Sequence, residues 1–111
     1  MQINVNQVVG AVLRHYRNRR KITSADVAIL AKVSRAMYSR YENGHTTVPT
    51  DVLYRIATKL HVKRSRFFRR IERTTDMLAE QFSIIVVDTC EPDVSLNKLI
   101  RCVAQHDLNV H

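Results

Sequence analysis

Residues 22–44 read ITSADVAILAKVSRAMYSRYENG, and the fold is most clearly indicated by this segment. Thr23 is a residue type that caps helix N-termini, and it opens a predicted helix over 24–31. Ser34 caps a second predicted helix over 35–42, and the glycine that closes the stretch supplies the left-handed position on which helices often end. The segment therefore predicts two short helices joined by a tight turn.

Further helices are expected on both sides of this segment. The chain has two glycines and two prolines, which favours helices over a barrel or sandwich. Thr50 is expected to cap a fourth helix that ends at Leu60, and a fifth helix begins near residues 63–65 and runs to about Gln81. Before the segment, helical spacing predicts a first helix with the apolar stripe Val5, Val8, Val9, Val12, Leu13 and Tyr16.

The end of the chain has a different pattern. Residues 82–88 are rich in β-branched side chains and uncharged until their last position, which predicts a short strand. Ser95 is expected to cap a last helix over 95–106. We therefore expect a mainly α protein, with a five-helix domain over 1–72 and an extension over 73–111.

The two short helices have the sequence form of a helix-turn-helix, and the segment resembles the phage-repressor-like (XRE or Cro type) helix-turn-helix family without a gap. The resemblance covers roughly residues 6–72 and implies a five-helix lambda-repressor-like domain of a DNA-binding transcriptional regulator. The positions that fit the family pattern are Ala28, Val33, Ser34, Arg35, Ser39, Arg40, Glu42, Asn43, Gly44, Pro49, Ile56, Ala57, Leu60 and Val62.

The second helix of such a motif enters the major groove, and its N-terminal residues reach the base edges. Arg35 and Ala36 stand at that end, and Ser39 and Arg40 follow about one turn later. We expect these four residues to contact bases, with both arginines reading guanines. The alternative for either arginine is that it only neutralises a phosphate.

Phosphate contacts are expected from polar groups at helix ends and in the loop after the reading helix. Two candidates depart from the family pattern: Ser24 stands where a glutamine is usual, and Lys32 stands where the turn usually has a glycine. A lysine there must adopt a left-handed backbone, or the turn has another shape. The alternative for the loop is a solvated segment without function. The full set of phosphate candidates is Ser24, Lys32, Asn43, His45, Thr46 and Thr47.

Glu42 has a structural interpretation. The resemblance implies that an acid at this site pairs with a basic residue of the first helix, and Arg17 is the matching position. We expect a partly buried ion pair between the two, with no catalytic meaning.

Charge divides the chain into two parts. The formal net charge is +8, but residues 1–73 carry a net charge of +12 and residues 74–111 a net charge of −4. A basic domain is typical of proteins that bind a polyanion, and the acidic tail is expected to stay away from it.

The tail is expected to form a homodimer. The sequence offers no second strand to pair with residues 82–88, so the same strand of a second copy is the expected partner. The residues predicted at this interface are Phe82, Ile84, Val86, Leu99 and Val103.

Three other functions compete with a repressor. An antitoxin would neutralise a toxin through the tail and regulate its own operon through the same DNA-binding domain. The arginines around Phe67 and Phe68 fit an RNA-binding patch or a membrane-surface helix, although Phe67 matches a core position.

Core or near-core packing is also expected for Val27, Leu30, Val33, Met37, Tyr38 and Tyr41.

Catalytic and metal sites are not expected. Cys102 and His106 stand four residues apart, a spacing that allows one metal, with Cys90 and His111 as further ligands; the simpler expectation is that Cys102 fills the core. Neither a nucleophile elbow nor a glycine-rich phosphate loop occurs, so we expect no enzyme and no cofactor. The chain lacks a signal peptide and a long apolar run, which predicts a soluble cytoplasmic protein.

Overall fold

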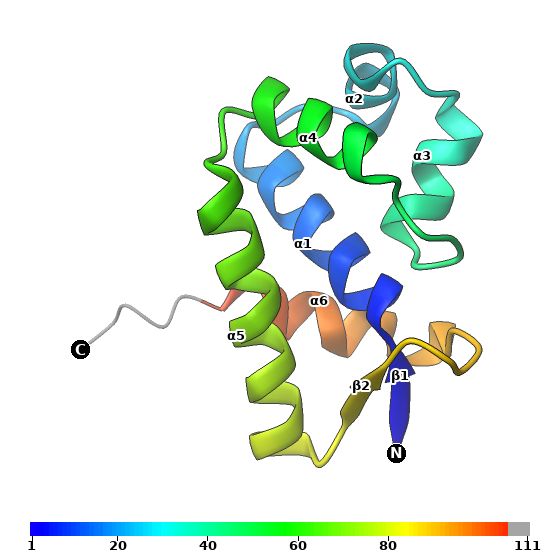
Figure 1. Ribbon diagram of the computed structural model, residues 1–111, viewed down its shortest axis with the longest axis vertical. Coiled ribbons are helices and arrows are strands. Elements are labelled where there is room, and N and C mark those ends of the chain that lie inside the picture. Colours follow the sequence, from blue (N-terminus) through cyan, green and yellow to red (C-terminus); the bar gives the residue numbers. More distant parts are fainter. Residues whose placement is uncertain (107–111) are drawn as a thin grey trace.

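The computed structural model describes residues 1–106 and is mainly helical (Figure 1). Six α-helices and a two-stranded parallel sheet lie within these residues, and none of the helices is long and apolar enough to cross a membrane. In chain order the elements are β1 (Gln2–Asn4), α1 (Val5–Arg19), α2 (Ser24–Ala31), α3 (Arg35–Glu42), α4 (Thr50–Lys59), α5 (Arg64–Phe82), β2 (Ile85–Val87), a short 3-10 helix (Val94–Leu96) and α6 (Asn97–Gln105).

Helix α1 lies at the centre of the fold, and α3, α5 and α6 all pack against it (Figure 1). Asn4 caps its N-terminus in a capping box with Gln7, which satisfies two backbone N–H groups reciprocally. The predicted apolar stripe is confirmed: four of its members, Val8, Val12, Leu13 and Tyr16, are buried, and Val5 and Val9 are partly buried.

Gly10 lets α1 approach the C-terminal end of α3. A Cβ atom at this position would lie closer to the carbonyl oxygens of Tyr41 and Glu42 than real Cβ atoms approach heavy atoms. The crossing of α1 and α3 therefore requires glycine here.

We expect Gly10→Ala to lower the free energy of unfolding by about 1–3 kcal/mol, since the clash involves backbone atoms that cannot rotate away. The same change in an unobstructed helix would raise stability by about 1 kcal/mol through helix propensity. Urea unfolding followed by circular dichroism gives the sign of the change in the free energy of unfolding. A stabilised variant would show that α1 and α3 move apart easily to accept the methyl group.

Helices α2 and α3 form the predicted pair. The side chains of Thr23 and Ser34 each accept a hydrogen bond from the backbone N–H three residues on, as expected for N-caps. Lys32 adopts the left-handed conformation that the turn requires, with φ of 60°, and Gly44 follows α3 with φ of 74°. Both turn predictions are confirmed.

The predicted core of this segment is confirmed only in part. Tyr38, Tyr41 and Val27 are buried and Val33 is partly buried, whereas the expectation for Leu30 and Met37 is wrong because both are exposed. Each helix has eight residues and buries only the face that meets α1, α4 or its neighbour. The short helices therefore leave apolar side chains at their outer surfaces.

Two predicted caps are wrong by one or two residues. Thr50 is the first residue of α4, and Pro49 occupies the cap position without a side-chain hydrogen bond. Ser95 does not cap the last helix; instead, its own N–H and hydroxyl donate to the Asp93 carboxylate, and α6 begins after a 3-10 turn at Asn97. Asp93 is fixed there because its backbone N–H and carbonyl both bond the side chain of Gln7.

The expectation that the strand has no partner within the chain is also wrong. Strand β2 is shorter than predicted and pairs in parallel with β1, Ile3 lying opposite Val86 (Figure 1). Phe82 belongs to α5, which ends where Ser83 adopts a left-handed conformation. The three residues of β1 are too few to show the alternation that identifies a strand, and their partner strand is distant in sequence.

Two of the five residues predicted at a dimer interface are already covered by this chain. Ile84 and Val103 are buried in its own core, and this corrects their assignment. Val86 and Leu99 are partly buried, and Phe82 is exposed.

The extension is bound to the first helix. The Gln7 side chain, which is buried, donates to Asn97 Oδ1 at 2.9 Å and to the carbonyl of Asp93 at 2.7 Å. The boundary placed after residue 72 falls inside the continuous helix α5, and α6 packs against α1. The two parts of the chain therefore share one core.

Candidate nucleic-acid interface

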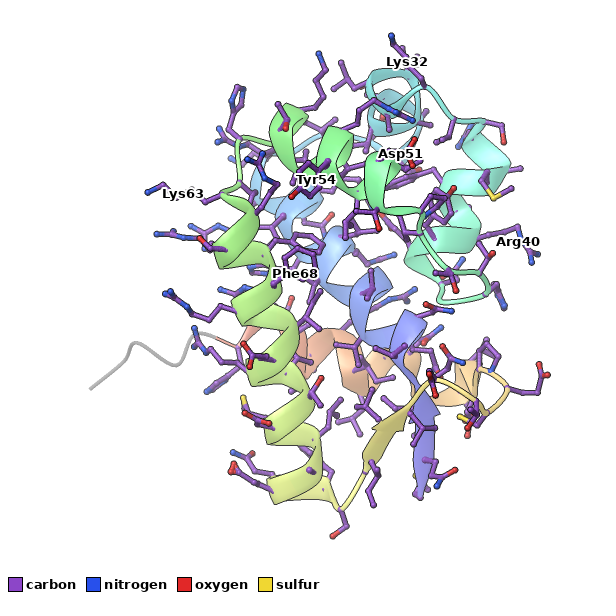
Figure 2. All side chains as sticks on the ribbon, in the orientation of Figure 1. Lys32, Arg40, Asp51, Tyr54, Lys63 and Phe68 are labelled. Carbon is purple, nitrogen blue, oxygen red and sulfur yellow. The ribbon has the colours of Figure 1, made fainter. Side chains whose placement is uncertain are left out.

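One face of α3 is free. Arg35, Ala36, Ser39 and Arg40 are all exposed, while Tyr38 and Tyr41 turn into the core. Figure 2 shows Arg40 directed away from the body of the molecule. The four residues predicted to contact bases thus share the surface with which a helix would enter a major groove.

The residues predicted to contact phosphates lie at both ends of α3 and at the start of α2. Lys32 is exposed and points outward from the turn (Figure 2), and His45 and Thr47 are exposed in the loop after α3. Three others, Ser24, Asn43 and Thr46, are partly buried. The Thr47 hydroxyl accepts a hydrogen bond from the Asn6 side chain at 3.1 Å, which ties this loop to the first turn of α1.

Asn43, directly after α3, is held by α6. Arg101 Nη2 donates to Asn43 Oδ1 at 2.7 Å, and Asn97 Nδ2 donates to the Asn43 carbonyl at 3.2 Å. The Asn43 amide in turn lies 3.4 Å from the hydroxyl of Ser39. The C-terminal helix therefore supports the end of the helix that bears the free face, which sequence reasoning missed because no local spacing links residues more than 50 positions apart.

The ion pair predicted between Arg17 and Glu42 is present. Arg17 Nε donates to Glu42 Oε2 at 2.5 Å and Nη2 donates to Oε1 at 3.1 Å, with side chains only 12% and 6% exposed. The hydrogen bond to Glu42 raises the pKa of Arg17, and burial raises the pKa of the neighbouring Tyr38 phenol. The pair fixes the C-terminal end of α3 to α1.

The family model for the helix-turn-helix domain matches residues 8–67. The chain belongs to the helix-turn-helix family. The match spans more than half of the chain and includes every residue predicted to contact DNA. Comparisons with curated proteins and with solved structures found no match.

Aromatic residues of this helix-turn-helix protein divide between core and surface. Phe67 is buried, as expected, whereas Phe68 is exposed. Tyr54 on α4 is also exposed, and the Arg64 guanidinium lies 4.5 Å from its ring centroid, a cation–π distance. Figure 2 shows Tyr54 and Phe68 on neighbouring helices at the surface, so this part of the α4–α5 surface is both basic and aromatic.

Both cysteines are free thiols. Cys102 is exposed, so the expectation that it fills the core is wrong: α6 turns this position outward while Val103 faces inward. Within residues 1–106 no three His, Cys, Asp or Glu side chains are grouped to hold a metal, and His111 lies outside the described residues.

Proposed function

We propose that this helix-turn-helix protein is a sequence-specific regulator of transcription that binds double-stranded DNA and acts as a dimeric repressor in the cytoplasm. The observation that carries the proposal is the free face of α3, where Arg35 and Arg40 stand exposed on a helix anchored from behind by Glu42. Bidentate arginines are the commonest readers of guanine in the major groove.

The proposed affinity has a large electrostatic part. Residues 1–73 carry a net charge of +12, so counterions released from DNA favour binding. Binding is expected to weaken by about a thousandfold or more between low and moderate salt, if about six phosphates are contacted.

The proposed dimer does not depend on an unpaired strand. One α3 helix covers only a few base pairs, so readers of this type bind two half-sites about one helical turn apart. The described surface near the sheet keeps exposed apolar side chains, among them Met1, Phe82 and Ile85, that a second copy would cover.

In vitro selection from a random duplex library, with the full chain at fixed salt, tests this function. The expected result is an enriched motif with two symmetry-related half-sites that contain guanines. Equal affinity for unrelated duplexes would contradict the proposal and favour an RNA-binding function.

Arg101→Ala is expected to weaken binding to the selected site by about fivefold, because Asn43 loses a charge-assisted hydrogen bond that holds it beside α3. Gel-shift titration measures the change. Lys98→Ala is the matched control, since Lys98 is an exposed cation of the same helix.

A double-mutant cycle shows whether Arg101 acts through Asn43. In an Asn43→Ala background the further change Arg101→Ala should have no effect on affinity. Additive losses would mean that Arg101 contacts DNA itself.

A further inference from the structure

A basic hollow lies where α1, the 60–63 turn and α5 meet, with a volume of about 470 Å³. Figure 2 shows Lys63, at its rim, pointing away from the molecule on the side opposite to Arg40. The hollow is therefore separate from the free face of α3. The side chains that matter for its chemistry are Tyr16, Arg19, Arg20, Lys63, Arg66 and Arg70.

The charge of this basic hollow is unbalanced. Five of its lining residues are lysine or arginine, and none is acidic. The ion pairs within residues 1–106 involve only Arg14, Arg17 and Arg55 as cations, so no carboxylate of these described residues pairs with the cations of the hollow. Like charges gathered around one concavity repel each other, and a bound anion would relieve this repulsion.

Two of the arginines are held in place by neutral groups. Arg20 Nε donates to the Leu60 carbonyl at 2.8 Å. Arg70 donates from Nε to the Tyr16 hydroxyl at 3.0 Å and from Nη1 to the Ala104 carbonyl at 2.7 Å. Because these partners are uncharged, both guanidinium groups keep their full positive charge while their orientation is fixed, and a ligand would meet a preorganised site.

The N-terminus of α5 adds partial positive charge at the rim. Lys63 is the N-cap of this helix, and its side chain makes no capping hydrogen bond. Within the described part of the chain the first backbone N–H groups of the helix are thus left without a side-chain cap, next to Lys63 and Arg66.

We propose that the basic hollow binds a small polyphosphorylated ligand. Its volume lies in the range of about 300–1,000 Å³ typical of small-molecule sites, which is larger than a single phosphate requires. Several cations around one concavity suit an anion with several charges. The proposal stands independently of the function of α3, and the position of the hollow allows ligand and DNA to be bound together.

Isothermal titration of the full chain with inorganic tripolyphosphate, at fixed ionic strength, tests the proposal. Wild-type protein is expected to show saturable binding, and Lys63→Gln/Arg66→Gln should weaken it by about tenfold or more. The matched control is Lys59→Gln/Arg69→Gln, which removes two exposed charges, one at the end of α4 and one on α5, that lie outside the hollow. This control should change affinity by less than about twofold.

Absence of saturable binding by the wild type, or equal weakening in both double variants, would overturn the proposal. All four substituted residues are exposed, and their side chains make no hydrogen bond within residues 1–106, so the variants are expected to retain the core. A parallel titration with duplex DNA tests whether the phosphate that binds at the hollow belongs to the DNA backbone. If only duplex binding depends on Lys63 and Arg66, the hollow binds the DNA backbone and the small-ligand proposal is wrong.

Discussion

Replacing Arg17 with methionine is expected to lower the free energy of unfolding by about 3–5 kcal/mol, because Glu42 stays buried without its main partner. Methionine preserves most of the aliphatic packing, so the loss reports on the charge. Urea unfolding followed by circular dichroism measures it. The C-terminal end of α3 should loosen as well, since Glu42 joins that end to α1.

Two further variants isolate the pair. Arg14→Met removes a more exposed arginine whose Nη1 lies 4.0 Å from Glu42 Oε1, and it should cost less than about 1 kcal/mol. Arg17→Met/Glu42→Leu removes both charges and should be more stable than Arg17→Met alone. If Arg17→Met were as stable as the wild type, solvent would have to compensate the charge of Glu42 despite the burial of its side chain.

Arg35→Ala is expected to reduce discrimination between bases at one base pair of each half-site by about 1–3 kcal/mol. This loss doubles when two copies bind one operator. Its side chain is exposed at the first position of α3, so the substitution should leave stability unchanged. Selection from the random library, repeated with the variant, should return a motif that has lost its preference at that position.

Lys32→Ala is the control for this experiment, because an exposed lysine in the turn before α3 is expected to meet phosphate only. It should weaken binding to all sequences alike and reduce the salt dependence. If Arg35→Ala leaves the selected motif unchanged, the assignment of base reading to Arg35 is wrong.

Elements whose signals are local could be predicted from the amino-acid sequence alone. Thr23 and Ser34 cap the two short helices, and Lys32 and Gly44 provide the left-handed positions that end them. Each of these signals lies within four residues of the group it satisfies, so one stretch of sequence contains all the information.

The Arg17–Glu42 pair was also predictable from the sequence, although the two residues are distant along the chain. Its prediction came from the family resemblance, which supplied the spatial contact that spacing alone does not contain. The exposure of Arg40 on α3 was predictable too, since Arg40 lies nearly opposite the buried Tyr38 on the helix.

The way in which distant parts of the chain meet is visible only in the three-dimensional structure. The pairing of β1 with β2, the hydrogen bonds from Gln7 to the extension and the support of Asn43 by Arg101 each join segments more than 50 residues apart. The basic hollow likewise combines α1, a turn and α5. Such contacts depend on how helices pack around a shared core, and helical periodicity specifies which face of a helix is buried but not which partner covers it.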